Sequence, residues 1–233
     1  MVLTLHWLER SKGHRILWLL EELGVPFEVK TYKRNPKTGL GDPDIKKIHP
    51  LGKSPTIEDD GKVIAETGLI IEYLIGKYGQ KAGLQAKDAD EDLKVKFALH
   101  HGEGSIGPTV ILMITTSLMK GSAVPWLARP LTSVIANQIE AAYPKQDLYK
   151  QLDFLENQLK ENNTGFFVGD HLSGADFMYL WALQQVFHDY NGFHGAVKFE
   201  DYPLLYKWIK SVHERPAMIR AYEKVPEDIP VFN

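Results

Sequence analysis

The sequence predicts a small α/β unit followed by a larger all-helical unit, and three observations support this fold class. Residues 1–80 alternate between strand-like and helix-like spacing of their apolar side chains. Residues 80–88 are mostly polar or small, as in a linker. The apolar patterns after residue 88 all have helical spacing. We therefore expect two domains, at residues 1–80 and 89–233.

The α/β unit is expected to begin with a strand at residues 2–7 and a helix at residues 13–23. That helix carries apolar side chains along one side, and Gly24 follows it where a helix commonly ends. A second strand is expected at residues 27–32, and a short helix at residues 42–48.

A hairpin completes the expected sheet. Its strands are residues 55–58 and 62–64, because Asp59-Asp60-Gly61 between them is typical of a tight turn. The helix at residues 66–78 follows, with Gly79 as its expected end. The order β-α-β-α-β-β-α implies a mixed sheet, made by a βαβ unit and a hairpin.

The helical unit is expected to contain helices at residues 89–119, 130–162, 174–190, 202–214 and 217–223. Gly104 and Pro108 are the expected places for a bend in the first of these, and Pro144 for an interruption of the second. Ser173 and Asp176 have nearly the spacing of a capping box, with Leu172 and Phe177 placed for a hydrophobic staple. These four residues are therefore expected to serve folding and not chemistry.

Composition excludes several classes of function. The chain has 233 residues and a net charge of −3, so it has no basic field that would gather nucleic acid or anionic lipid. It has no cysteine, which excludes disulfide scaffolds, thiolate metal sites and a protein thiol nucleophile. We find no signal peptide and no apolar run long enough for a transmembrane helix, so a soluble protein is expected.

Ser11 lies between the first expected strand and the first expected helix. A hydroxyl just ahead of a helix points at free backbone N–H groups and at the positive end of the helix dipole, a place that favours an anion such as a bound thiolate. A serine that only caps the helix or stabilises a turn gives the same pattern. Arg15, one turn later, is equally suited to an internal ion pair and to a ligand contact.

Two further segments carry polar groups near the ends of strands. In the segment before the third strand, Lys53 could hold a carboxylate, and Pro55 must begin the strand or lie at an edge. Thr67 and the first N–H groups of the next helix could bind a carboxylate, while Glu66 offers an acceptor for an ammonium. Solvated side chains and an acidic residue at a helix start are the simpler interpretation of each segment taken alone.

A metal site is not expected. His100 and His101 are adjacent on a helix and do not share a face, so both cannot easily bind one metal ion. Most aromatic side chains of the helical unit are expected in the core, with a few lining an apolar cleft; this set is Trp126, Phe166, Phe167, Phe177, Tyr179, Trp181 and Phe187.

Four motifs, in order along the chain, resemble those of serine-type cytosolic glutathione transferases. They are Ser11-x-x-x-Arg15-Ile16-x-Trp18-x-Leu20-Glu21-Glu22-Leu23, His49-Pro50-x-Gly52-Lys53-Ser54-Pro55, Ala65-Glu66-Thr67, and Leu172-Ser173-Gly174-Ala175-Asp176. The resemblance covers essentially the whole chain and is strongest to the yeast-type fungal branch. It departs from the family at Thr67, where serine is commoner, and at His49, where asparagine is usual.

The resemblance implies a thioredoxin-like N-terminal domain with a cis bond at Pro55, followed by an all-helical domain that completes an electrophile cleft. Ser11 would stabilise the glutathione thiolate, and the backbone of Ser54 would pair with the cysteinyl unit. Lys53 would reach the glycyl carboxylate, while Glu66 and Thr67 would hold the γ-glutamyl end. No cofactor is expected, because glutathione is a cosubstrate.

The expected activity is conjugation of glutathione to hydrophobic electrophiles. Two alternatives stay open: reduction of organic hydroperoxides by the same thiolate, and a non-catalytic module that stores ligands or serves assembly. A homodimer is expected, because the helix at residues 66–78 has more apolar side chains than one sheet face can cover. The expected location is the cytoplasm, and the resemblance to fungal relatives adds a peripheral association with internal membranes.

Overall fold

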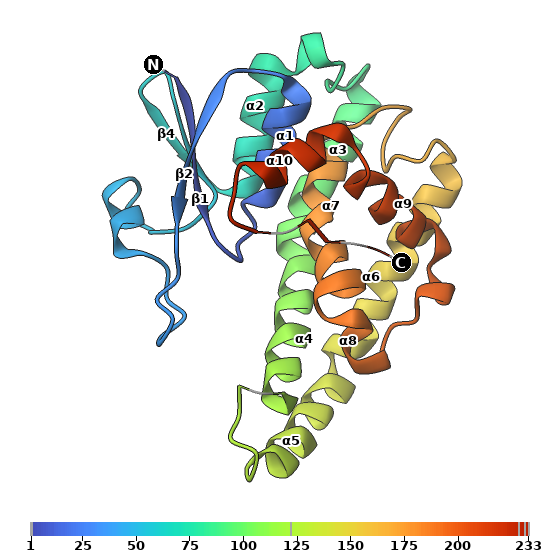
Figure 1. Cartoon of the computed structure of the whole chain (residues 1–233). Helices are drawn as coiled ribbons and strands as arrows, with labels where there is room; N and C mark the ends of the chain where they lie inside the picture. The colour runs from blue at the N-terminus through green and yellow to red at the C-terminus, as the bar shows by residue number, and fades with distance from the viewer. Residues whose placement is uncertain (1, 122, 228, 231, 233) are drawn as a thin grey trace.

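The computed structural model describes residues 2–121, 123–227, 229, 230 and 232. A small sheet with its helices lies on one side of the molecule, and a larger group of helices lies on the other (Figure 1). The strands of the described residues all fall between residues 3 and 65. This arrangement is a thioredoxin-like domain followed by a helical domain, as predicted. The boundary at residues 80–89 stays a prediction.

The sheet has four strands in the order β2-β1-β3-β4. Strand β1 (Leu3–Leu8) runs parallel to β2 (Phe27–Tyr32), while β3 (Thr56–Asp59) is antiparallel to both β1 and β4 (Lys62–Ala65). Asp60 and Gly61 both have positive φ angles, 48° and 77°, as a two-residue hairpin turn requires. The predicted βαβ unit and hairpin are therefore both present.

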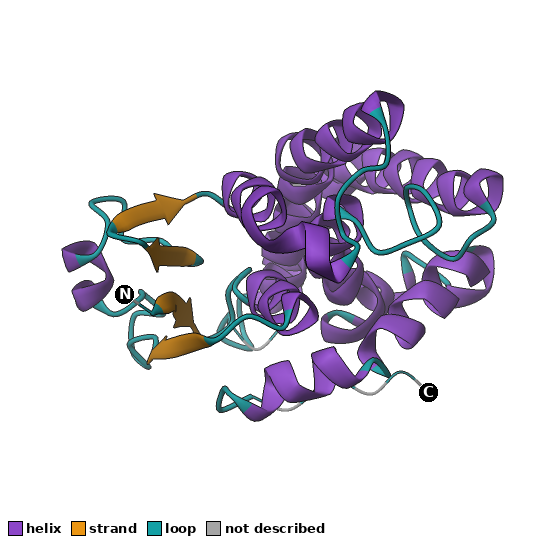
Figure 2. Cartoon of the chain, turned by 90° about the horizontal axis from the view of Figure 1, so that it is seen from above, coloured by secondary structure: helices purple, strands orange, loops and turns teal. Residues whose placement is uncertain are grey.

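Helices α1 (His14–Leu23) and α2 (Thr67–Ala82) lie between the sheet and the helical domain (Figure 2). The short helix between β2 and β3 is the 3₁₀ helix η1 (Pro43–Lys47). The prediction that α2 ends at Gly79 is wrong. Gly79 is buried inside the helix, and the last turn closes at Gly83, whose φ of 67° is the left-handed conformation that glycine adopts easily.

The first long helix of the helical domain is interrupted by a π-helical turn. Helix α3 (Ala89–His101) passes through η2 (Gly102–Ile106) into α4 (Gly107–Lys120). Pro108 lies directly after this wide turn, in the first turn of α4, and the chain stays helical through it. The irregularity expected at Gly104 or Pro108 is thus a wider turn around Gly104.

The second long helix is broken before Pro144, as predicted, into α5 (Arg129–Ala142) and α6 (Pro144–Asn162). The remaining elements, in order, are α7 (Gly174–Gln184), η3 (Gln185–Asp189), α8 (Asn191–Gly195), η4 (Phe199–Asp201), α9 (Pro203–His213) and α10 (Pro216–Glu223). Helix α7 is buried almost all round and packs against α1, α2, α3 and α9. It is the centre of the core.

The start of α7 confirms the predicted capping box. The backbone N–H of Ser173 donates to the carboxylate of Asp176 at 2.9 Å, and the indole N–H of Trp208 donates to the same side chain at 3.1 Å. Burial raises the pKa of Asp176 to about 6, although these donors act in the opposite direction. Leu172 and Phe177 are both buried here.

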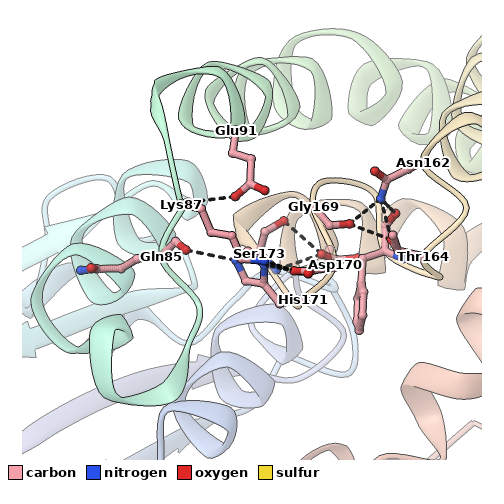
Figure 3. Close-up of polar contacts among 11 residues, drawn as sticks. Gln85, Lys87, Glu91, Asn162, Thr164, Gly169, Asp170, His171 and Ser173 are labelled. Carbon is pink, nitrogen blue, oxygen red and sulfur yellow. Dashed lines mark hydrogen bonds and ion pairs between the residues drawn. The ribbon is translucent and has the colours of Figure 1, made fainter.

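The connection from α2 to α3 is fastened to the loop that precedes α7 (Figure 3). The ammonium of Lys87 pairs with Asp170, and His171 Nε2 lies 3.0 Å from the carbonyl oxygen of Gln85. The side-chain amide of Asn162, at the end of α6, donates to the carbonyl oxygen of Gly169 on the same loop at 2.7 Å. The predicted linker is therefore held against the helical domain by side-chain bonds.

Helices α4 and α5 extend beyond the rest of the molecule as a hairpin (Figure 1). Trp126, one of the aromatic residues expected in the core or along the cleft, is in neither place, because its side chain is 72% exposed in the loop between the two helices. Several neighbours on the hairpin are also exposed and apolar: Ile111, Leu118, Leu127, Leu131, Val134 and Ile135. No helix among the described residues is both long and apolar enough to cross a membrane.

Candidate functional site

The register of the sheet brings the three predicted polar segments to one edge. His6 of β1 pairs with Thr56 of β3, which pairs in turn with Ala65 of β4. The residues just beyond this row are the end of β1, the turn before β3, and the start of α2. Ser11, Ser54 and Glu66, which are far apart in the sequence, therefore belong to the same end of the sheet.

Ser11 lies in the loop between β1 and α1, half-buried. The N-terminal cap of α1 is Gly13 and not Ser11. Ser11 Oγ accepts the N–H of Gly13 at 3.1 Å and lies 3.4 Å from Ser54 Oγ. A Cβ atom at position 13 would lie 2.6 Å from Trp7 Cδ1, so only glycine allows the loop to approach the indole this closely.

Ser54 is held against the end of β1 by its own side chain. Its hydroxyl donates to the carbonyl oxygen of His6 at 3.0 Å and accepts the N–H of Leu8 at 3.0 Å. The single hydroxyl proton of Ser54 is therefore used, and Ser11 must be the donor in the long contact between the two hydroxyls. The peptide bond between Ser54 and Pro55 is cis, as the resemblance implied.

The remaining predicted ligand residues surround the start of α2. Glu66 is the N-terminal cap residue, with a φ of 73°, and its side chain is exposed. Thr67 begins the helix and is buried, whereas Lys53 is exposed on the loop before β3. Glu66 supplies a negative charge at this edge, next to the unpaired N–H groups of the first helical turn.

Three charged residues lie beneath this edge, between α1 and the π-helical turn. The guanidinium of Arg15 is 1% exposed and pairs with Glu103 at 2.6 Å, while also donating to the carbonyl oxygen of Met178 at 2.8 Å. Lys12 pairs with the second oxygen of Glu103 and lies over the ring of Trp181. Arg15 is thus an internal ion-pair partner, one of the two roles left open by its position in the sequence.

These contacts fix the charge of Glu103. Burial by itself would raise the pKa of Glu103, but the positive charges of Arg15 and Lys12 and their hydrogen bonds outweigh it and hold the pKa below its ordinary value. Burial and the neighbouring guanidinium lower the pKa of Lys12. The pairs link the N-terminal domain to the helical domain.

A cavity of about 620 Å³ opens beside Ser11. Its walls come from α1, α4, α7, η3, α10 and the C-terminal tail, with Ile114, Trp181, Tyr190, Tyr222 and Pro230 as the apolar or aromatic side chains. The sequence left open which helical residues line the cleft. Only Trp181 among these five was in the predicted aromatic set.

The two adjacent histidines have separate surroundings. His101 Nε2 lies 2.6 Å from Gln151 Oε1, and its Nδ1 lies 3.1 Å from the hydroxyl of Tyr179. His100 is exposed on the other side of the helix. Within the part of the chain that the structure describes, no group of three or more histidine, aspartate and glutamate side chains could hold a metal ion.

Comparison with known proteins supports the same assignment from the sequence. Residues 11–75 match the family model described as "Glutathione S-transferase, N-terminal domain", and residues 130–225 match "Glutathione S-transferase, C-terminal domain". The chain is 33% identical over 232 residues to glutathione S-transferase 1 of Saccharomyces cerevisiae, covering 96% of this chain and 95% of the yeast protein.

Solved structures agree with this result. A glutathione S-transferase from Actinobacillus pleuropneumoniae superposes with a TM-score of 0.74 at 28% identity, over 96% of this chain and 92% of that one. A glutathione transferase homologue from Lodderomyces elongisporus, described with two glutathione molecules per subunit, has the same fold, with a TM-score of 0.72 at 23% identity over 97% and 100% of the two chains. The chain therefore belongs to the glutathione S-transferase family.

Proposed function

We propose that this protein binds reduced glutathione at the edge of the sheet, ionises its thiol, and transfers the thiolate to an electrophile in the cavity beside Ser11. The observation that carries the proposal is the hydroxyl of Ser11, which lines this cavity. Among the described residues, the proton of that hydroxyl is engaged only in a contact of 3.4 Å with Ser54 Oγ. Such a proton is available to an incoming thiolate. Conjugation is the principal reaction, and hydroperoxide reduction is a second use of the same thiolate.

One hydroxyl donor and one helix dipole together can supply the free energy that ionisation of the glutathione thiol requires. A free thiol has a pKa of about 8.5, and lowering it by ~2 units requires ~2.7 kcal/mol of preferential thiolate stabilisation. A hydrogen bond to a charged acceptor contributes ~1.5–3 kcal/mol, and the helix dipole ~0.3–1 kcal/mol. We therefore propose that neither a metal ion nor a second base takes part, and that glutathione is a cosubstrate.

The direct test is titration calorimetry with glutathione, followed by a conjugation assay with 1-chloro-2,4-dinitrobenzene. Binding together with conjugation is expected. Binding without any conjugation or hydroperoxide reduction would favour the alternative of a non-catalytic module for ligand storage or assembly. The presence of Ser11 beside an open cavity favours the enzyme over that module.

Glu66→Ala is expected to weaken glutathione binding by ~10–100-fold, because an ammonium partner that contributes ~1.5–3 kcal/mol is lost. Both residues carry a Cβ atom, so the positive φ at this position strains them alike. The measurement is the dissociation constant from calorimetry. Glu28→Ala is the control. It removes an exposed carboxylate from β2, an outer strand of the sheet that carries none of the proposed glutathione contacts, and should leave the dissociation constant unchanged. Equal affinities in all three proteins would refute the role of Glu66.

We also propose a homodimer, formed through α2 and α3. Ile70, Ile71 and Leu74 of α2 are buried in the chain itself, so they are not the surplus that the sequence suggested. The apolar side chains left exposed on these helices are Leu69, Leu93 and Phe97, at 54%, 68% and 49%. A symmetric contact between two copies would cover them.

Leu93→Glu is expected to convert the dimer to a monomer, because it places a charge in the centre of an apolar contact. Light scattering at micromolar concentration gives the mass. Leu127→Glu is the matched control, since Leu127 is 75% exposed but lies at the tip of the α4–α5 hairpin. A wild-type protein that is monomeric at this concentration would exclude the dimer.

The cytoplasmic location and the peripheral association with internal membranes stay predictions. The exposed apolar side chains of the α4–α5 hairpin, which include Trp126 and Leu127, offer one surface for such an association.

A further inference from the structure

The cavity beside Ser11 carries more polar groups than a hydrophobic electrophile requires. Besides the apolar and aromatic side chains, its lining includes Glu227, His14 and the neighbouring pair His188 and Asp189. His188 Nδ1 and Asp189 Oδ1 are 2.7 Å apart, so these two side chains satisfy each other. Glu227 and His14 are then the titratable side chains of this set that have no role in the proposed conjugation reaction.

Glu227 is brought to the site by the tail that follows α10. Helix α10 packs against α1, and the chain beyond it returns toward the loop between β1 and α1. There Glu227 Oε1 accepts the backbone N–H of Arg10 at 2.8 Å, which is the residue directly before Ser11. The carboxyl group is therefore held at the loop that carries Ser11, and both residues line the same cavity.

His14 stands on the other side of this carboxyl group. Its Nε2 lies 3.5 Å from Glu227 Oε2, and the structure gives that nitrogen no hydrogen-bond partner among the described residues. The ring stacks on Tyr222, with centroids 4.5 Å apart, and the side chain is 9% exposed. Burial lowers the pKa of His14 to about 4, so the imidazole is neutral at pH 7 and adds no positive charge beside Glu227.

The other groups that face Glu227 act on its pKa in both directions, and the net effect is to raise it. Burial raises the pKa of Glu227, the negative charges of Glu9 and Asp189 add to this, and the N–H and guanidinium of Arg10 act against it without reversing it. Tyr222, packed on His14, is buried and its pKa is raised, so it carries no charge. Glu227 thus has the surroundings of a general acid.

We propose that Glu227 protonates the oxygen that leaves when the glutathione thiolate reduces an organic hydroperoxide. This inference rests on the proposed function. The sulfur attacks the terminal oxygen of ROOH, the O–O bond breaks, and its electron pair goes to RO, which takes the proton of Glu227 and leaves as ROH. The sulfur is oxidised to a sulfenic acid, GSOH, and the peroxide oxygen is reduced.

The cycle closes with a second glutathione. Its thiolate attacks the sulfur of GSOH, which gives the disulfide GSSG and releases hydroxide. Hydroxide takes a proton to become water, and Glu227 recovers its proton from solvent. In sum, two GSH and one ROOH give GSSG, ROH and H₂O. An alkoxide is a poor leaving group unless it is protonated, whereas the chloride released by conjugation needs no proton, so only the first reaction requires the acid.

The test is Glu227→Gln, which keeps an acceptor for the Arg10 N–H but has no proton to release. The ratio of cumene hydroperoxide reduction to 1-chloro-2,4-dinitrobenzene conjugation should fall ~100-fold, the usual effect of a lost general acid. The matched control is Glu223→Gln, an exposed carboxylate at the end of α10, which should keep the wild-type ratio. Circular dichroism and thermal melting establish that both variants fold.

The pH dependence gives a second readout. The hydroperoxide reaction of the wild type should rise with pH as the thiolate forms and fall at higher pH as Glu227 loses its proton, whereas Glu227→Gln should show only the rise. A variant that keeps both the wild-type ratio and the alkaline fall overturns the inference. So does a wild type that conjugates glutathione without reducing the hydroperoxide, and that result leaves the proposed binding and conjugation of glutathione intact while excluding its second reaction. A wild type that does not bind glutathione in calorimetry overturns the proposed function itself.

Discussion

Ser11→Ala is expected to lower the turnover of conjugation by ~100-fold at pH 7, because it removes a donor aimed at developing negative charge. A donor that stabilises the thiolate lowers the pKa of the bound thiol. Its removal raises that pKa, so less thiolate is present at a given pH. The rising limb of the pH–rate profile should therefore move to higher pH, together with the thiolate absorbance in the ultraviolet.

Glutathione affinity should change little in the same variant, because Glu66, Thr67 and the Ser54 backbone are untouched. Ser11→Thr is the companion variant, since it restores a hydroxyl and should recover part of the turnover. If Ser11→Ala keeps wild-type turnover and an unshifted rising limb, Ser11 serves only to accept the N–H of Gly13. Another donor would then have to stabilise the thiolate.

Glu103→Gln is expected to destabilise the protein by ~3 kcal/mol, because it leaves the buried guanidinium of Arg15 without its counter-charge. For a chain of this size that corresponds to a melting temperature lower by ~6–12 °C. The matched control is Asp92→Asn, which breaks the exposed pair with Lys96 and should cost less than ~1 kcal/mol. Differential scanning calorimetry at pH 7 measures both.

The same pair gives a dependence on pH with a definite sign. The pKa of Glu103 is lower in the folded protein than its ordinary value. Its stabilising contribution is therefore complete above pH ~4.5 and is lost as the pH falls through the folded pKa. The melting temperatures of wild type and Glu103→Gln should approach each other in acid. A constant difference between pH 7 and pH 3 would show that the ion pair is not the source of the stability.

Local sequence patterns were sufficient to predict most of the helices, strands and turns of the fold. The hairpin followed from Asp60-Gly61, the end of α1 from Gly24, and the break between α5 and α6 from Pro144. Each of these depends on the conformational limits of one residue and its neighbours, which a sequence displays directly. Gly79 shows the limit of such reasoning, because a glycine ends a helix only where the chain also turns away, and α2 continues against the core for another turn.

The same distinction applies to the residues of the site, because some of them had a local sequence signal and others had none. Ser11, Ser54 and Glu66 each adjoin a strand or helix end, so the order of elements was enough to bring them to one edge. Glu227 had no such signal, because the tail after α10 has no periodic pattern and reaches Arg10 across 217 positions of the sequence. Trp126 was misplaced for a related reason: an aromatic residue next to a proline gives no information about whether a loop lies on the core or on the outside.

The π-helical turn at Gly102–Ile106 sets the phase of everything that follows it on the same helix. One residue adds about 100° of rotation to an α-helix. The wide turn takes up one residue more than an ordinary turn, so deleting Gly104 would convert it into an ordinary turn and leave the outer half of the hairpin in the same phase. A deletion farther along α4, before Ile114, has no wide turn to absorb it and would rotate the outer half of the hairpin by about that angle relative to its base. Ile114 would then leave the cavity wall. The position of a single-codon deletion along this helix thus decides whether the wall that faces the second substrate stays the same or changes.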